Sequence, residues 1–177
     1  HRLNVLGYLD LSPFGEKYRD SANAGNLDLI AALEWIRDNI EGFGGDPENV
    51  TLFGQSGGGV KVWSLLQMPE ADGLFHKGII ESGVVDPDLL GDIEDGNGRE
   101  IVKAMLAELG LEEKDVDQLE TLPYDQLAQA YENAAPKVAQ KGEYVGNHPH
   151  KNQSYFGDAI KHGFREETKK IPLLIGT

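Results

Sequence analysis

Ser56 lies at the centre of the segment Gly54–Gly58, which reads Gly-Gln-Ser-Gly-Gly and fits the pattern Gly-x-Ser-x-Gly. The β-branched and aromatic run Val50–Phe53 precedes this motif and is typical of a buried strand, whereas Val60–Gln67 after it is compatible with a helix. A chain that turns from strand to helix within a few residues holds the residue at the turn in a strained conformation, with its side chain exposed. The motif therefore predicts that the Ser56 hydroxyl is presented as a nucleophile.

The glycines around Ser56 fit this geometry. Gly54 and Gly58 are predicted to lie where a Cβ atom would collide with the neighbouring strand or helix. Ser56 would then project over the carboxyl edge of a sheet at a helix N-terminus, with the Gly57 amide aimed at the same spot as one of two oxyanion donors. The alternative is an ordinary turn that contains a serine, and the strand and helix on the correct sides of the motif argue against it.

Strand and helix patterns alternate through the first half of the chain. Leu3–Leu9 is a mostly apolar run that predicts a strand buried on both faces, as in parallel sheets. Asn26 is predicted to be the N-cap of a helix that ends at Gly42, and Lys77–Gly83 is predicted to form a third strand. The apolar stripe of that helix is formed by Leu29, Leu33, Ile36 and Ile40. This order predicts an α/β fold, with a mostly parallel sheet and crossover helices.

The second half of the chain has a different character. It begins with the acidic segment Asp86–Gly98, which is expected to be a solvated loop, and it ends with the apolar strand Ile171–Thr177. Between them we expect two helices and an irregular polar stretch, near residues 101–109, 123–134 and 142–155. We therefore expect one domain overall, made of a core (1–83), a helical insertion and loop (84–170) and a returning core strand (171–177). Insertions of this kind commonly shape a pocket.

Several segments strongly resemble type B carboxylesterases, the family of the cholinesterases and bacterial para-nitrobenzyl esterases. The resemblance is carried by the Gly-x-Ser-x-Gly motif and by residues 25–40, 43–51, 74–77, 81–83 and 171–177. It implies a partial α/β-hydrolase fold and a serine carboxylic ester hydrolase that works through an acyl-enzyme on a small-molecule ester, without a cofactor. Ser56 is the implied nucleophile and Gly57 an implied oxyanion donor. Gln55 and Gly57 stand where the family often has Glu and Ala, and neither difference removes a reacting group.

The same resemblance implies groups that lie outside this sequence. The family takes further oxyanion amides from an upstream Gly-Gly turn, its triad acid from a few residues beyond the Gly-Thr at 176–177, and its histidine from further on. We therefore expect the chain to be a central fragment of a larger esterase and to be inactive alone. The alternative is a non-catalytic adhesion or scaffolding module with the esterase fold.

A histidine of this chain could in principle serve as a local base for Ser56. His1 begins a predicted strand and His76 precedes one, so both are expected at the amino end of the sheet, away from the catalytic edge. His148 and His150 are expected in a solvated loop. None of the four is therefore expected to pair with Ser56, although a local histidine stays the explanation to consider if the chain alone proves active.

Two groups of residues resemble metal sites, and neither has the required spacing. A zinc site lacks a helical His-x-x-x-His or a similar fixed arrangement, and its candidate ligands are His148, His150, Asp158 and His162. The acidic segment matches an EF-hand loop only at Asp86, Asp88 and Gly91, because Leu90 and Asn97 occupy two ligand positions. We therefore predict no metal site.

Ser82 is expected to form hydrogen bonds with backbone groups beneath the turn that carries Ser56.

Composition excludes several classes of partner. The 177 residues include 16 basic and 30 acidic side chains, and the net charge of −14 repels polyanions such as nucleic acid and anionic membranes. No apolar run approaches the roughly 18 residues needed to cross a bilayer. The absence of cysteine excludes disulfides and thiolate metal sites. A sheet whose edge strands are unpaired is also expected to self-associate.

Overall fold

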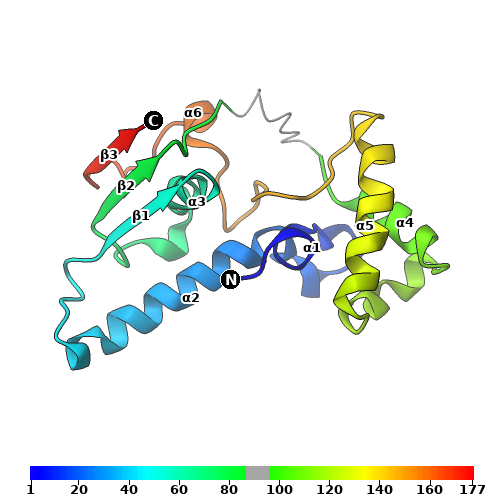
Figure 1. The fold of residues 1–177 in the computed structure, drawn as a ribbon, viewed down its shortest axis with the longest axis horizontal. Helices are drawn as coiled ribbons and strands as arrows, with labels where there is room; N and C mark the ends of the chain where they lie inside the picture. The colour runs from blue at the N-terminus through cyan, green and yellow to red at the C-terminus, as the bar shows by residue number, and fades with distance from the viewer. Residues whose placement is uncertain (87–95) are drawn as a thin grey trace. The chain divides into compact units, whose positions relative to one another are not determined.

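A computed structural model describes residues 1–86 and 96–177 of the chain. The EF-hand positions Asp88, Leu90 and Gly91, which do not predict a calcium site, and most of the acidic segment lie outside the described residues. The strands are β1 (Thr51–Gln55), β2 (Lys77–Glu81) and β3 (Leu173–Gly176). The α-helices are α1 (Asn4–Tyr8), α2 (Ala24–Asn39), α3 (Gly57–Leu65), α4 (Arg99–Glu108), α5 (Tyr124–Ala139) and α6 (Ala159–His162) (Figure 1).

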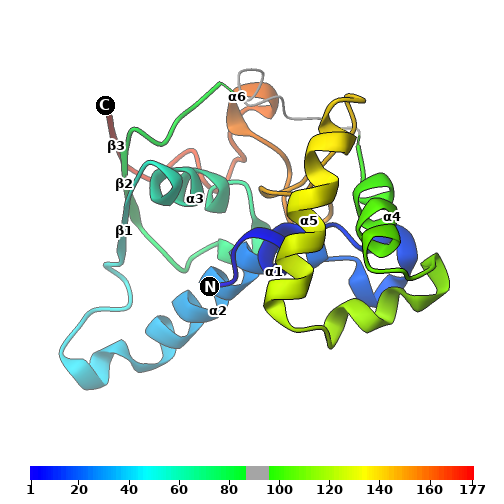
Figure 2. The same cartoon turned by 45° about the vertical axis from the view of Figure 1, so that its right-hand side comes forward.

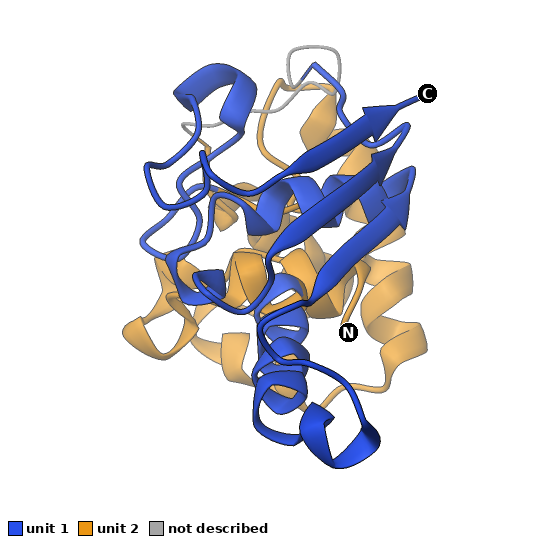
Figure 3. Cartoon of the chain, turned by 90° about the vertical axis from the view of Figure 1, so that its left-hand side faces the viewer, with its two compact units in different colours: residues 1, 26–92, 151–177 blue, residues 2–25, 93–150 orange. Residues whose placement is uncertain are grey.

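The contacts divide the chain into two compact units (Figure 3). Unit 1 contains residue 1, residues 26–92 and residues 151–177, and it holds the sheet. Unit 2 contains residues 2–25 and 93–150 and is helical. The division into a core, an insertion and a returning strand within one domain stays a prediction.

Unit 1 is built on a parallel sheet with the strand order β1-β2-β3. The register aligns Phe53 with Ile79 and Ile79 with Leu174, so these side chains share one face. Seen edge-on in Figure 2, the strands form one layer and α3 lies on one side of it. Ile80, on the face that α3 covers, is fully buried. The predicted parallel sheet with crossover helices is confirmed.

The helix α3 is held in unit 1 by contacts with several other segments. Asn26 Nδ2 in α2 donates to Ser64 Oγ at 2.7 Å, and both residues are buried. Trp63 Nε1 donates to Asp158 Oδ2 at 3.0 Å, and the Trp63 ring meets Phe164 edge-on. The prediction that Asn26 caps α2 is wrong, because α2 begins at Ala24 and the Asn26 side chain bonds to a neighbouring helix. Tertiary hydrogen bonding has replaced local capping.

The segment that leads into β3 is also fixed within unit 1. The Arg165 guanidinium donates two hydrogen bonds to the carboxylate of Asp72, one of them 2.8 Å long, and it stacks over the Phe156 ring. The pKa of Arg165 is raised, mainly because of its hydrogen bond to Asp72. The entry to β3 is therefore tied to the loop that follows α3.

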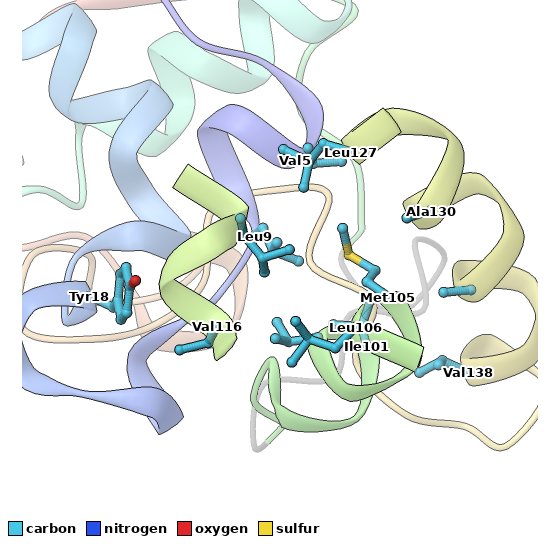
Figure 4. Close-up of a cluster of buried hydrophobic side chains, with 13 residues drawn as sticks. Val5, Leu9, Tyr18, Ile101, Met105, Leu106, Val116, Leu127, Ala130 and Val138 are labelled. Carbon is cyan, nitrogen blue, oxygen red and sulfur yellow. The ribbon is translucent and has the colours of Figure 1, made fainter. Parts of the chain in front are cut away.

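Unit 2 packs α1, α4, α5 and the 3-10 helix Glu113–Glu120 around an apolar cluster (Figure 4). The spacing predicted for α4 is confirmed, since Ile101 and Met105 are fully buried and Leu109 packs against the cluster. The helix predicted near residues 123–134 is also confirmed. It is α5, which continues past Ala134 to Ala139.

The strand predicted over Leu3–Leu9 is wrong, because Asn4–Tyr8 forms the helix α1. Its amides bond locally, with the Leu6 and Gly7 N–H groups donating to the Leu3 carbonyl. Val5 of this helix and Leu9 directly after it join the apolar cluster of unit 2 instead of a sheet. A short apolar run suits a buried helix as well as a buried strand, and its pattern does not separate the two.

A buried carboxylate joins the N-terminal segment of unit 2 to α4. Asp10 is 2% exposed, and its two oxygens accept hydrogen bonds from the Ser12 amide at 2.9 Å and the Gly98 amide at 2.8 Å. Gly98 is the N-cap of α4, and a Cβ there would lie 1.7 Å from the Asp10 carbonyl oxygen. Asp10 therefore caps α4 from a distant part of the chain.

We predict that Asp10→Ala lowers the free energy of unfolding by about 1–3 kcal/mol, because it leaves two amides without their acceptor. Denaturant unfolding of the chain, followed by circular dichroism, measures this change. Glu132→Ala removes an exposed carboxylate in α5 and is the control. Equal stability of the two variants would show that Asp10 does not hold α4.

Candidate active site

Ser56 occupies the turn between β1, which ends at Gln55, and α3, which begins at Gly57. Its backbone has φ 51° and ψ −121°, a combination that non-glycine residues rarely adopt. The Ser56 amide donates to the Glu81 carbonyl at 2.8 Å, and the Ser56 carbonyl accepts from the Val60 amide at 2.9 Å. The side chain is exposed. The turn is thus strained and fixed on both sides, and the hydroxyl faces solvent.

The glycines next to Ser56 have different roles from one another. A Cβ on Gly54 would lie 2.3 Å from the carbonyl carbon of Gly58, so β1 and α3 touch through their backbones. A Cβ on Gly57 or on Gly58 would meet no neighbour within 4 Å. The steric reason predicted for Gly54 is therefore confirmed, whereas that for Gly58 is wrong. Gly58 matters as the backbone that Gly54 approaches.

The amide of Gly57 lies at the first position of α3, where no carbonyl within the helix can accept from it. The positive end of the helix dipole adds to its attraction for an anion. Such an amide can stabilise negative charge that develops on a substrate oxygen beside Ser56. Its assignment as an oxyanion donor, like that of Ser56 as the nucleophile, stays a prediction.

The ring nitrogens of His76, His148, His150 and His162 contact residues other than Ser56. His76 precedes β2, and its Nδ1 accepts from the Val50 amide at 3.2 Å, so it lies at the amino end of the sheet as expected. His162 Nε2 lies 3.5 Å from Lys151 Nζ.

The solvated-loop interpretation is wrong for His150, which is 8% exposed. Its backbone exchanges two hydrogen bonds with the Asn23 side chain, and its Nε2 lies 2.8 Å from the Gly96 carbonyl oxygen. The Tyr144 ring packs against the His150 ring, and the two ring centroids lie 4.4 Å apart. Within the described residues no cluster of histidine, aspartate or glutamate has the geometry for a metal ion.

A hollow of about 260 Å³ borders α3 in unit 1. Leu52, Phe53 and Gly58 contribute to its lining, together with apolar residues of α2 and α3, but Ser56 does not. Lys61 also lines it, and burial lowers the pKa of that amine. The hollow lies beside β1, and its lining does not connect it with the Ser56 hydroxyl.

The surroundings of Gly54 and Gly57 predict unequal effects of adding a methyl group. Gly54→Ala should lower the free energy of unfolding by about 1–3 kcal/mol, because the methyl group forces β1 and α3 apart. Gly57→Ala should change it by less than about 0.5 kcal/mol, because the methyl group enters open space. Denaturant unfolding of both variants checks this, and equal losses would contradict the backbone contact between β1 and α3.

A model of the carboxylesterase family matches residues 1–177. The para-nitrobenzyl esterase of Bacillus subtilis (strain 168) is 38% identical over 187 residues, which cover 100% of this chain and 35% of that protein. The human cocaine esterase is 49% identical over 84 residues, or 48% of this chain.

Solved structures agree with this match. An esterase from anaerobic Clostridium hathewayi, described as able to hydrolyze aliphatic aromatic polyesters, is 55% identical with a TM-score of 0.95, and the match covers 100% of this chain and 35% of that one. A thermophilic PNB esterase is 36% identical with a TM-score of 0.79. The chain thus spans about 35% of the Bacillus subtilis and Clostridium hathewayi enzymes, and the predicted partial α/β-hydrolase fold is confirmed. This chain belongs to the carboxylesterase family.

Proposed function

We propose that the polypeptide carrying this chain is a serine carboxylic ester hydrolase with Ser56 as its nucleophile. The observation that carries the proposal is the strained, exposed Ser56 between a parallel strand and a helix N-terminus. Membership of the carboxylesterase family supports it independently. A serine held at a cost in backbone strain is expected where the strain serves a reaction.

The reaction would proceed through an acyl-enzyme. Ser56 Oγ attacks the ester carbonyl carbon while a base takes its proton, and the oxyanion rests on the Gly57 amide and further amides. The alcohol leaves with a proton, and water then attacks the acyl-enzyme and releases the acid. The base, its acidic partner and the further amides would come from parts of the polypeptide outside this chain. These steps use no cofactor or metal.

The substrate we propose is a small-molecule ester. The names of the relatives point to para-nitrobenzyl esters and, for the Clostridium hathewayi enzyme, to polyesters. A nucleic acid is disfavoured as a partner by the net charge of −14. None of the described helices combines the length and hydrophobicity that crossing a bilayer requires.

We predict that Ser56→Ala in the full-length protein lowers kcat/KM for short-chain nitrophenyl esters by about three orders of magnitude or more. The variant loses the nucleophile but should keep the fold. Ser12→Ala, at an exposed serine of unit 2, is the control and should retain activity. Turnover by Ser56→Ala at the rate of the control would refute the proposal.

The same assay separates the alternatives. The 177-residue chain alone should show no ester turnover that depends on Ser56, because we expect the general base for Ser56 in another part of the full-length polypeptide. Activity of the isolated chain that Ser56→Ala abolishes would instead point to a local histidine. A full-length protein that a fluorophosphonate probe does not label would favour the non-catalytic adhesion or scaffolding module.

We further propose that the isolated chain associates with a second copy through its sheet. Phe53 is 77% exposed and Leu174 is 66% exposed, and with Ile79 they form an apolar row on the face opposite α3. β1 and β3 are the edge strands of the described sheet. Exposed apolar faces and edges of this kind favour association.

Sedimentation at micromolar concentration should therefore show dimers or larger species. Phe53→Lys should shift the chain toward the monomer, whereas the exposed-site control Glu41→Lys should not. Added salt should strengthen association, because it screens the repulsion between two chains of charge −14. A monomeric wild-type chain would contradict the proposal.

A further inference from the structure

The sequence contains a single asparagine that is followed by glycine, Asn97 before Gly98. In such a pair the glycine nitrogen can attack the side-chain carbonyl carbon of the asparagine, because glycine carries no side chain that hinders the closing ring. Asparagine is for this reason a thermolabile residue. Asn97 is exposed, so water reaches its side chain. Deamidation is therefore chemically available at this position, and its rate depends on how the backbone is held.

The nitrogen that would attack is held by a distant carboxylate. The Gly98 amide donates to Asp10 Oδ2 at 2.8 Å, and both residues are buried. A Cβ on Gly98 would lie 1.7 Å from the Asp10 carbonyl oxygen and 2.6 Å from the carbonyl carbon, so the two backbones are in close contact. The Asn97 side chain is also engaged, because its Oδ1 accepts from the Arg99 amide at 3.0 Å. Both reacting groups of the pair are thus fixed.

The Asp10 carboxylate opposes the reaction by its charge. Gly98 must lose its amide proton as its nitrogen attacks, and negative charge then builds up on that nitrogen. A buried carboxylate at 2.8 Å stabilises the protonated amide and repels the deprotonated one. The repulsion is strong because the protein interior screens charge poorly. Attack is therefore suppressed as long as the contact between Asp10 and Gly98 lasts.

Other contacts of unit 2 hold the chain on either side of Asn97. On one side, His150 Nε2 lies 2.8 Å from the Gly96 carbonyl oxygen. On the other side, the Arg99 guanidinium donates to the Pro13 carbonyl at 2.9 Å. Release of Asn97 therefore requires the N-terminal segment of unit 2 to separate from the start of α4, which is a local opening and not complete unfolding.

We propose that Asn97 is a deamidation site that Asp10 keeps closed, and that it reacts in molecules whose N-terminal segment has opened. The Gly98 nitrogen then forms a bond to the Asn97 side-chain carbonyl carbon, and the bond from that carbon to Nδ2 breaks. The amide proton of Gly98 leaves with the side-chain nitrogen as ammonia. Water opens the resulting cyclic imide at either carbonyl and gives aspartate or isoaspartate at position 97.

The isoaspartate product keeps the segment open. In isoaspartate the main chain runs through the former side chain, so a methylene group is added to the backbone before Gly98. The site leaves no room for such a shift, because Gly98 lies directly against the Asp10 backbone. The Gly98 amide then no longer reaches Asp10, and α4 loses its cap. The reaction therefore converts a transient opening into a permanent change.

Peptide mapping by mass spectrometry, during incubation of the full-length protein at mildly alkaline pH, measures the conversion of Asn97. The folded wild-type protein should react at least about tenfold more slowly than the same protein unfolded in urea. Asp10→Ala should raise the rate in the folded protein about tenfold, because two hydrogen bonds that oppose opening are lost. Glu132→Ala, which removes an exposed carboxylate of unit 2, is the matched control and should react like the wild type.

A second comparison separates the Asp10 contact from overall stability. Gly54→Ala is expected to destabilise the protein about as much as Asp10→Ala, but the contact it disturbs lies in unit 1. Asn97 should therefore react in Gly54→Ala at close to the wild-type rate. Asp10→Asn keeps the size of the side chain and removes its charge, so it should fold and should react faster than the wild type. This variant decides the question even if Asp10→Ala does not fold.

The proposal fails on any of three results. Deamidation of the folded wild-type protein at the rate found in urea would show that the fold gives Asn97 no protection. Equal acceleration in Gly54→Ala and Asp10→Ala would assign the protection to overall stability. A rate in Asp10→Asn no higher than that of the wild type would show that the Asp10 charge does not oppose the reaction. None of these results depends on Ser56, so the proposed function stands or falls separately.

Discussion

The backbone contact between Gly54 and the first turn of α3 is the constraint on which the rest of the site depends. It sets the separation between β1 and α3, and in the turn that joins them Ser56 has a strained conformation. The exposed hydroxyl of Ser56 lies at this close approach, and beside it lies the Gly57 amide, which has no acceptor within α3 because it begins the helix. Favourable contacts elsewhere must offset the strain, since a relaxed turn would place the two elements further apart.

Those contacts surround α3 within unit 1. The sheet lies on one side, Asn26 of α2 holds Ser64, and Asp158 holds Trp63. The helix is therefore attached by buried or half-buried polar side chains as well as by the apolar residues around Ile80. Polar bonds of this kind are directional, and they fix how the helix is rotated more closely than apolar packing alone would.

The elements that local patterns define were predictable, and those that depend on distant partners were not. The strand before Ser56, the turn itself, α2, α4 and α5 follow from residue types within a short window. The apolar run Leu3–Leu9 predicts a strand, because a short run of this kind does not reveal that its residues pack in the helical cluster of unit 2. Asn26, Asp10 and His150 were misjudged or missed for the same reason. Each is a polar residue whose partners lie far away in the sequence. At the site, the Gly54 contact was foreseeable, whereas the open space at Gly58 required coordinates.

The anchoring of the segment before β3 has a consequence for how such proteins diversify. Trp63–Asp158 and Arg165–Asp72 attach residues 151–172 to unit 1 without using any residue between 93 and 150. The third strand can thus keep its place while the intervening sequence lengthens, shortens or is exchanged. Evolution or a protein engineer can exchange residues 93–150 together with their partners in residues 2–25, such as Val5 and Asp10, provided that the indole and guanidinium anchors are retained.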